Sequence, residues 1–256
     1  MKCVILAGGF GTRFSEETDN KPKPMIEIGG MPILWHIMKI YESHGITDFI
    51  ICLGYKGNLI KEYFSNYFLY MSDVTIDLKN NNLTVHRKNA EPWKITLVDT
   101  GINSMTGGRL LNVKKYLSKT ESFCFTYGDG LSDINISDEI KFHNSHDKIA
   151  TICAVQPPNR YGVLSIKDTT VKSFQEKPSD SGWINGGFFI LKYDAIDFIE
   201  NEQTIWEKEP LNKLAQMGEL QSYLHKSFWH PMDTLRDQRY LDDLWNNNKS
   251  PWKTWK

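Results

Sequence analysis

Glycines, basic side chains and aspartates in this sequence are the residue types that phosphate chemistry needs. A glycine-rich stretch follows a short apolar run near the N-terminus: Leu6, Ala7, Gly8, Gly9, Phe10, Gly11, Thr12 and Arg13. Glycines let the backbone turn tightly and bring bare N–H groups against an anion. The planar guanidinium of Arg13 can bind two phosphate oxygens. The stretch therefore predicts a phosphate-binding loop.

This loop fits neither of two common phosphate motifs. A dinucleotide-binding Gly-x-Gly-x-x-Gly that began at Gly9 would need glycine at position 14, which is Phe14. A Walker loop would need Gly-Lys followed by Ser or Thr, and that combination does not occur in the sequence.

A rigid basic segment comes next, with Lys21, Pro22, Lys23, Pro24 and Met25 in succession. Prolines on both sides of Lys23 stiffen the backbone, so its ammonium is expected to be held in place. The alternative is an exposed basic turn with no chemical role.

Two aspartates are candidate metal ligands. Asp129 lies between Gly128 and Gly130 at the end of an expected strand, at the edge where open α/β sheets bind ligands. Asp233 lies in a turn just before a helical pattern. The alternatives are a turn residue for Asp129 and a helix N-cap for Asp233.

The elements that must position these side chains alternate between buried strands and helices. Apolar, β-branched and aromatic runs predict strands over 3–7, 49–54, 95–99 and 123–129, and helical spacing predicts helices over 32–44, 58–68 and 108–117. This order predicts an α/β fold with a doubly wound, mostly parallel, Rossmann-like sheet.

The remaining sequence modifies that plan. Residues 72–92 predict an inserted hairpin around an Asn-rich turn. The second half is richer in strands, with runs over 151–158, 162–166, 171–176 and 184–191, and helical segments near 194–200, 208–217 and 234–245. We expect one domain over 1–256, with 1–130 mainly binding a nucleotide and 131–256 forming a β-rich far wall.

Composition excludes several other classes. Lys and Arg total 30 against 31 Asp and Glu, a net charge of −1, so no global basic field is available to hold nucleic acid. Four cysteines each lie alone in an apolar run, which predicts buried, reduced thiols. No window is long enough for a membrane-spanning helix, and we expect a cytoplasmic protein.

The glycine loop and the Lys23 segment together resemble the signature of sugar-1-phosphate nucleotidylyltransferases. The resemblance extends along nearly the whole chain, through Phe174–Pro178 and Asn185–Gly187. Four further stretches resemble the cytidylyltransferase branch in particular: Glu91–Trp93, Asp99–Gly101, Met105–Arg109 and Trp229–Thr234.

The resemblance implies transfer of a cytidylyl group from CTP to a hexose 1-phosphate, glucose 1-phosphate in this branch, by a homo-oligomer. The product would serve deoxysugar and surface polysaccharide (O-antigen) biosynthesis. Asp129 and Asp233 would hold Mg²⁺, and Lys23 and Arg13 would be catalytic. With the glycine loop, the nucleotide would contact Thr100, Ser104, Arg109 and Gly128. The sugar phosphate would contact Tyr127, Glu176, Lys177, Asn185 and Gly186.

Several alternative functions are compatible with the same residues. A uridylyl- or thymidylyltransferase, or a mannose-1-phosphate enzyme, would share most of these residues. A catalytically silent relative would be expected to have lost Lys23 or a metal aspartate, whereas Lys23, Asp129 and Asp233 are all present in this sequence. His143 and His146 form a His-x-x-His pair that we expect on a solvated helix face. The Trp-rich tail is expected to pack on its own chain or on a neighbouring subunit.

Overall fold

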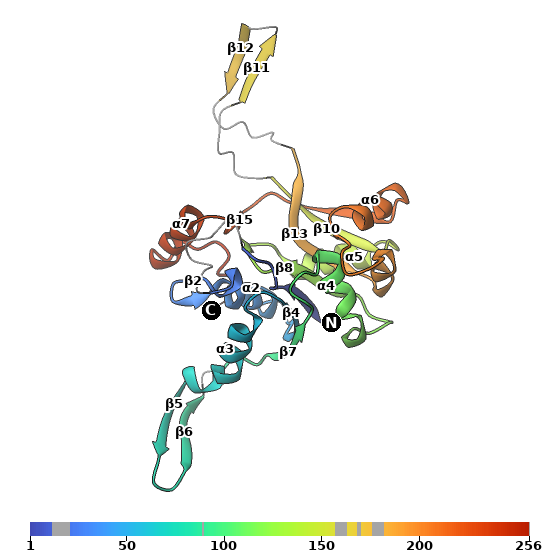
Figure 1. Ribbon diagram of the computed structural model, residues 1–256. Coiled ribbons are helices and arrows are strands. Elements are labelled where there is room, and N and C mark those ends of the chain that lie inside the picture. Colours follow the sequence, from blue (N-terminus) through green and yellow to red (C-terminus); the bar gives the residue numbers. More distant parts are fainter. Residues whose placement is uncertain (12–20, 89, 157–162, 168–169, 176–181, 256) are drawn as a thin grey trace.

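A seven-stranded sheet forms the centre of the molecule, in the order β14-β10-β13-β8-β1-β4-β7 (Figure 1). The computed structural model describes residues 1–11, 21–88, 90–156, 163–167, 170–175 and 182–255. Neighbouring strands are parallel except around β13, which is antiparallel to both β8 and β10. The strands are β1 (Cys3–Leu6), β4 (Asp48–Leu53), β7 (Lys94–Asp99), β8 (Phe123–Tyr127), β10 (Ala150–Val155), β13 (Ile184–Leu191) and β14 (Leu220–His225).

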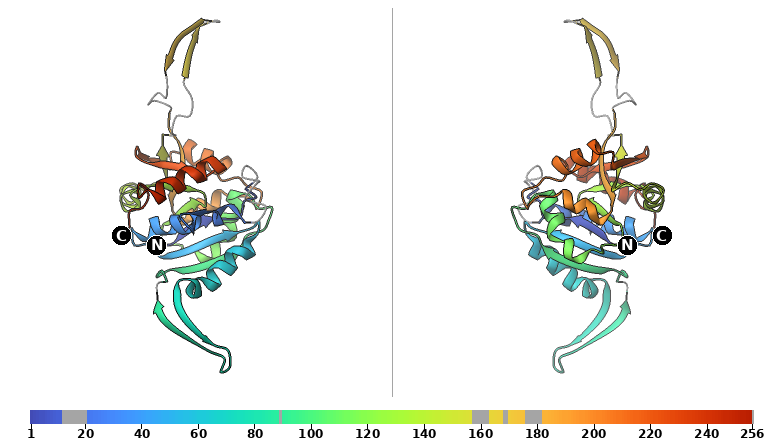
Figure 2. Two further views of the ribbon diagram at one scale, coloured as in Figure 1. Left: turned by 90° about the vertical axis from the view of Figure 1, so that its left-hand side faces the viewer. Right: turned by 90° about the vertical axis from the view of Figure 1, so that its right-hand side faces the viewer.

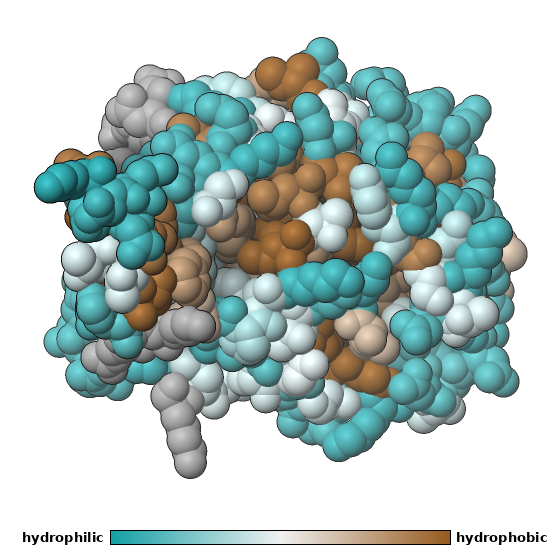
Figure 3. Space-filling model, turned by 90° about the horizontal axis from the view of Figure 1, so that it is seen from below, coloured by the Kyte–Doolittle hydropathy of each residue, from teal (hydrophilic) through white to brown (hydrophobic). Residues whose placement is uncertain are grey.

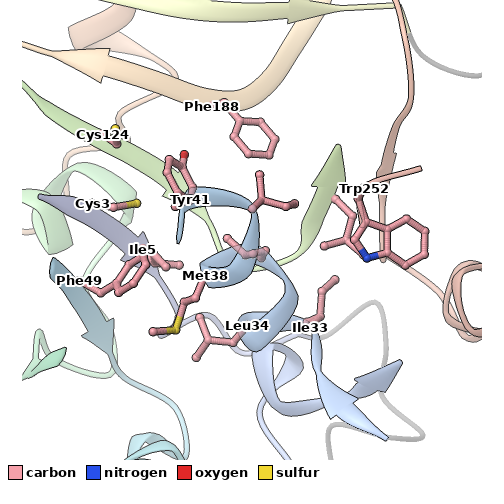
Figure 4. Packing of buried hydrophobic residues seen from close by; sticks show 14 of the residues in the cluster. Cys3, Ile5, Ile33, Leu34, Met38, Tyr41, Phe49, Cys124, Phe188 and Trp252 are labelled. Carbon is pink, nitrogen blue, oxygen red and sulfur yellow. The ribbon is translucent and has the colours of Figure 1, made fainter. Parts of the chain in front are cut away.

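Helices cover both faces of this sheet. Cys3 and Ile5 of β1 belong to one buried cluster, whereas Val4 and Leu6 belong to the other, as alternation along a strand buried on both sides requires. In the first cluster, Leu34, Met38 and Tyr41 pack near β1 (Figure 4). That face carries α2 (Ile33–Glu42), α3 (Gly57–Tyr70), α5 (Ile136–Asn144) and α7 (Leu235–Asn246); the other carries α4 (Thr106–Asn112) and α6 (Glu209–Gln216).

The predicted α/β fold is therefore confirmed, with shifted boundaries. The expected helix over 108–117 is two pieces, α4 and a 3-10 turn over Lys114–Tyr116. The segment near 194–200 is a 3-10 helix over Tyr193–Phe198. The expected strand 123–129 ends at Tyr127, because Gly128 and Asp129 leave the ladder for the loop beyond it.

In the part of the chain that the structure describes, four small two-stranded sheets accompany the central one. The expected hairpin is β5 (Ser72–Asp77) with β6 (Asn82–Lys88), and it projects from the end of α3 away from the body (Figures 1 and 2). The others pair β2 (Glu27–Ile28) with β3 (Met31–Pro32), β9 (Gly130–Ser132) with β15 (Trp229–Pro231), and β11 (Val163–Lys167) with β12 (Thr170–Gln175).

The Trp-rich tail packs on its own chain. Trp252 is fully buried, and its indole stacks on Trp245 and Phe228. Trp255 meets the ring of Trp35 at a centroid distance of 5.8 Å. The tail thereby closes the first cluster beside α2.

All four cysteines are free and buried, as predicted. Among the described residues, no helix has the length and apolar character needed to cross a bilayer.

The expectation of a solvated His143 is wrong. Its side chain is buried, and its ring nitrogens lie 2.9 Å from Thr151 Oγ1 and 3.2 Å from Ser122 Oγ. Burial lowers the His143 pKa to about 4, so the ring is neutral near pH 7. This side of α5 packs against β10, a contact that the polar local sequence does not reveal.

Glu139 on the same helix supplies a pH-dependent prediction. The carboxyl is fully buried, neither oxygen has a hydrogen-bond partner among the described residues, and burial raises its pKa to about 8. The unfolded chain releases this proton near pH 4.5 while the folded chain keeps it. This group therefore lowers the free energy of unfolding by about 1.4 kcal/mol per pH unit as pH rises from 4.5 to 8.

Glu139→Gln should remove that slope. Melting temperatures measured from pH 5 to 8.5 should fall less steeply for the variant, which becomes the more stable protein at the alkaline end. Asp138→Asn, a change to a half-exposed carboxylate one residue earlier, is the control. Parallel curves for wild type and Glu139→Gln would contradict a proton held at Glu139.

Candidate active site

A cavity of about 760 Å³ opens at the carboxyl ends of the central parallel strands. Its walls come from the loops after β1, β7 and β8, from the start of β13, and from the β15–α7 turn. Parallel strands end at the same edge, so this edge gathers the loops that a ligand contacts. Residues distant in sequence meet here, including Gly9, Lys23, Ser104, Asn185 and Asp233.

At one end of the cavity, Lys23 lies between the two aspartates. Its Nζ donates to Asp129 Oδ2 at 2.6 Å and to Asp233 Oδ1 at 2.9 Å. Burial by itself lowers the Lys23 pKa, but the two carboxylates outweigh burial and raise it above the ordinary value. Because one nitrogen contacts both carboxylates, both lie within reach of a single small cation.

Local structure explains why these three side chains meet. Lys23 begins a one-turn 3-10 helix over Lys23–Met25, entered from the extended Pro22. The β9–β15 pair joins the segments that follow Asp129 and precede Asp233. Met232 N also donates to the carbonyl oxygen of Asp129 at 2.8 Å.

Asp233 is not the helix N-cap that its sequence context also allowed. Thr234 caps α7, and Thr234 and Asp237 form a reciprocal capping box. Asp237 accepts the backbone N–H of Asp233 at 3.2 Å and that of Thr234 at 2.9 Å. The cap leaves the Asp233 carboxylate directed at Lys23.

The glycine loop turns tightly where β1 ends. Gly11 has φ +65°, a conformation that glycine adopts at no steric cost. A Cβ on Gly8 would lie 2.2 Å from Arg109 Nη1, whereas a Cβ on Gly9 would meet no described residue within 4 Å. Gly8 is therefore packed inward while Gly9 borders the cavity. Thr12 and Arg13, predicted as part of this loop, lie outside the described residues.

Arg109 connects three loops from the inside. Its guanidinium donates to the carbonyl oxygens of Gly8, Leu53 and Gly101, at 2.8 to 3.0 Å. It also donates to Thr100 Oγ1 at 2.9 Å and Ile102 O at 3.3 Å. Arg109 borders the cavity, yet these donors bind the protein itself.

Thr100 and Ser104 also turn to the backbone. Thr100 Oγ1 donates to Leu53 O at 2.6 Å, and Ser104 Oγ donates to Thr100 O. The expected role of all three side chains as direct nucleotide contacts remains a prediction. Their observed role is to hold together the loops after β1, β4 and β7.

Tyr127 and Asn185 border the cavity, whereas the neighbouring Gly186 is buried beside Val155. Asn185 Nδ2 donates to the Tyr127 hydroxyl at 3.2 Å, and Trp229 Nε1 donates to Gly186 O at 2.7 Å. Glu207, which the sequence motifs did not single out, accepts from the Tyr127 hydroxyl and from Thr106 Oγ1. Glu176 and Lys177, predicted to bind the sugar phosphate, lie outside the described residues.

The carboxylates fit a hard cation whose remaining ligands come from elsewhere. Mg²⁺ in phosphate-transfer sites is held by one or two carboxylates together with phosphate oxygens and water. In the part of the chain that the structure describes, no group of three or more His, Cys, Asp or Glu side chains is arranged as a metal site. A two-aspartate site that depends on the substrate for further ligands suits both observations.

Comparison with known proteins agrees with this fold. The sequence profile described as nucleotidyl transferase matches residues 2–246, and the chain belongs to this family. Glucose-1-phosphate cytidylyltransferase of Salmonella typhimurium is 61% identical over the full length of both chains. The probable glucose-1-phosphate cytidylyltransferase of Bacillus subtilis is 43% identical, again over both full lengths. Among solved structures, HddC of Yersinia pseudotuberculosis superposes with a TM-score of 0.69 at 25% identity, covering 95% of this chain and 99% of that one.

Proposed function

We propose that this protein transfers a cytidylyl group from CTP to glucose 1-phosphate, giving CDP-glucose and pyrophosphate. The observation that carries the proposal is the meeting of Lys23, Asp129 and Asp233 beside the glycine loop, at the cavity formed by the sheet edge. The full-length identity of 61% to a glucose-1-phosphate cytidylyltransferase supports the choice of base and sugar.

The reaction is a direct displacement. A phosphate oxygen of the sugar 1-phosphate attacks the α-phosphorus of CTP, and pyrophosphate leaves in line. The nucleophile is already an anion, so the main obstacle is repulsion between two highly charged partners. Fixed positive charge and positioning overcome this repulsion. Backbone N–H groups of the glycine loop would bind the triphosphate, with Arg13, and Lys23 would neutralise the charge that develops at the α-phosphate.

Asp129 and Asp233 would hold Mg²⁺ with the triphosphate. When bound, the ion would neutralise phosphate charge. Lys177 would anchor the phosphate of the sugar, and Glu176, Tyr127 and Asn185 would contact the sugar. Thr100, Ser104, Arg109 and Gly128 would shape the nucleotide subsite, for which the Arg109 network is the observed scaffold.

The two halves of the chain would divide these tasks. Loops after β1, β4 and β7 lie within 1–130 and would serve the nucleotide. Asn185 and Gly186 at the start of β13 lie within 131–256 and would serve the sugar phosphate. Asp233 belongs to the second half but lies beside Asp129 of the first half, because Lys23 donates to both carboxylates.

Pyrophosphate release tests the proposal directly. CTP, UTP, dTTP, ATP and GTP are each assayed with glucose 1-phosphate and with mannose 1-phosphate, with Mg²⁺ and with EDTA. We expect activity with CTP and glucose 1-phosphate that EDTA abolishes. A preference for UTP or dTTP would contradict the cytidylyl assignment. Absence of transfer from every nucleotide would favour a silent nucleotide-sugar-binding relative.

We also propose that the protein is a homo-oligomer and that the β5–β6 hairpin lies in its interface. The hairpin projects from the body and exposes Ile76 (61%), Leu78 (88%) and Leu83 (46%). A two-stranded hairpin is marginally stable alone in water, so a second copy covering this apolar surface would stabilise it. Viewed from below, from the end that bears the hairpin, the surface shows hydrophobic areas among polar side chains (Figure 3).

Light scattering after gel filtration measures the assembly. Wild type should have a mass of at least two chains. Leu78→Ser combined with Ile76→Ser should shift that mass toward one chain of 29.6 kDa, whereas the exposed polar change Lys79→Ser should not. A wild-type monomer, or an assembly indifferent to the double substitution, would contradict the proposed interface.

A further inference from the structure

Glu207 lies behind the wall of the cavity that Tyr127 and Asn185 form. Tyr127, Asn185 and Thr106 border the cavity, and Glu207 is not among the residues that do so. Glu207 Oε2 accepts from Thr106 Oγ1 at 2.6 Å, and Glu207 Oε1 accepts from the Tyr127 hydroxyl. One carboxylate therefore connects Thr106, at the start of α4, to Tyr127, which would contact the sugar.

The direction of each hydrogen bond in this chain is determined by its neighbours. Thr106 Oγ1 accepts the backbone N–H of Trp206 at 2.9 Å, so its own proton goes to Glu207. A carboxylate only accepts hydrogen bonds, so the Tyr127 proton also points to Glu207. Burial, followed by the charge of Glu207, raises the Tyr127 pKa, which keeps the phenol protonated at neutral pH.

Asn185 is oriented in the same way. Its Oδ1 accepts the backbone N–H of Gly187 at 2.8 Å, so its amide nitrogen faces Tyr127 and donates to the hydroxyl oxygen at 3.2 Å. A phenolic oxygen has one proton and two lone pairs. The Tyr127 hydroxyl donates its proton to Glu207 and accepts from Asn185 with one lone pair. Only its second lone pair is left, so Tyr127 can offer a ligand in the cavity only a hydrogen-bond acceptor.

The Tyr127 ring cannot turn away from this arrangement easily. Gly187 has φ +81°, and a Cβ there would lie 2.6 Å from Tyr127 Cδ2, so the ring packs directly on the Gly187 backbone. The ring also meets Phe189 edge-on, at a centroid distance of 6.0 Å.

We propose that Glu207 is a positioning residue that determines sugar selectivity, because it holds Tyr127 as an acceptor and so requires a donating hydroxyl at one position of the sugar. This inference rests on the proposed function and adds a residue and a rule of selection to it. Glu207 acts through Tyr127 and touches no reacting atom.

Sugar analogues test, in the full-length protein, whether a sugar hydroxyl must donate a hydrogen bond to Tyr127. The assay uses CTP, Mg²⁺ and glucose 1-phosphate, with its monodeoxy and monodeoxyfluoro analogues at C2, C3, C4 and C6. Fluorine is close to a hydroxyl in size and cannot donate. In the wild type, the deoxy and the fluoro analogue at one position should both lose about 10- to 100-fold in kcat/KM, because the buried acceptor is left unpaired.

Glu207→Gln should turn the Tyr127 hydroxyl from a hydrogen-bond acceptor into a donor toward that position of the sugar. Thr106 still needs an acceptor, so the carboxamide oxygen faces Thr106 and the amide nitrogen faces Tyr127. Tyr127 then turns its proton to the cavity. The fluoro analogue should gain about tenfold relative to the deoxy analogue, and the parent sugar should lose about tenfold. The KM for CTP should stay within about threefold of wild type, since the nucleotide contacts are unchanged.

Glu202→Gln is the matched control, because Glu202 is exposed on the same loop and its carboxylate contacts Asn112, not Tyr127. It should keep the wild-type pattern. A Glu207→Gln variant that slows all sugars by one common factor would reduce Glu207 to a structural support and overturn the inference. The inference would also be overturned if the wild type were active and no position of the sugar required a donating hydroxyl.

Tyr127→Phe keeps the inference testable if Glu207→Gln fails to fold. Removal of the acceptor should bring the parent, deoxy and fluoro sugars at that position within about threefold of one another. Unchanged discrimination in Tyr127→Phe would overturn the inference. Failure of the proposed function is distinguishable, because the wild type would then transfer no cytidylyl group to unmodified glucose 1-phosphate.

Discussion

Lys23→Ala should lower kcat by on the order of 10²- to 10³-fold, the usual effect of removing one preorganised charge from a site where charge develops. Lys23 is mostly buried, and both hydrogen bonds of its ammonium go to the aspartates of the proposed metal site. No flexible surface lysine can substitute for a charge held in that geometry. The steady-state rate of pyrophosphate release from CTP and glucose 1-phosphate measures the effect.

Lys21→Ala provides the matched control. Lys21 lies two residues earlier in the same proline-stiffened segment, but it is half exposed and pairs with Glu27 at 2.6 Å. This variant should retain kcat within about twofold, because an exposed ion pair contributes little. Both variants should show cooperative unfolding near the wild-type temperature. Normal turnover in a folded Lys23→Ala variant would remove Lys23 from the mechanism.

Asp129→Asn and Asp233→Asn should each reduce kcat/KM by at least about 10³-fold, because each change removes one of two carboxylates that would hold the metal ion. Loss of either carboxylate should also weaken binding of Mg²⁺ with CTP. Titration calorimetry measures that binding without turnover, and raising the Mg²⁺ concentration should restore part of the activity.

Asp243→Asn, an exposed change on the same helix that follows Asp233, is the control and should bind the metal and turn over as the wild type does. Loss of metal binding is separable from misfolding, since the side chains of Thr234 and Asp237 form the α7 capping box. Full EDTA-sensitive activity in both aspartate variants would show that the metal is held elsewhere.

Local sequence was informative where local physics decides the outcome. The apolar runs at 3–7 and 49–54 became β1 and β4, because a parallel strand covered on both faces must be apolar throughout. The glycine loop, the proline-flanked Lys23 and the Asp129 turn were all recognisable, since each depends on backbone preferences of neighbouring residues.

The sequence was less informative about what surrounds those motifs. Arg109 was expected to contact the nucleotide through the family resemblance, yet its donors in the structure hold Gly8, Leu53 and Gly101. His143 was expected on a solvated face and is buried against β10. Glu207 carried no motif at all. In each case the partner lies in a different element, far away in sequence.

Taken alone, the amino-acid sequence determined the fold class, the glycine-rich turn after the first strand, and the side chains with suitable charge, because periodicity and turn chemistry act over a few neighbouring residues. Only the tertiary structure decided that Lys23, Asp129 and Asp233 share one point, and that Glu207 determines which way the Tyr127 proton points. Those outcomes depend on strand pairing and burial between segments up to 210 positions apart. No local sequence pattern identifies which distant residue a side chain will contact.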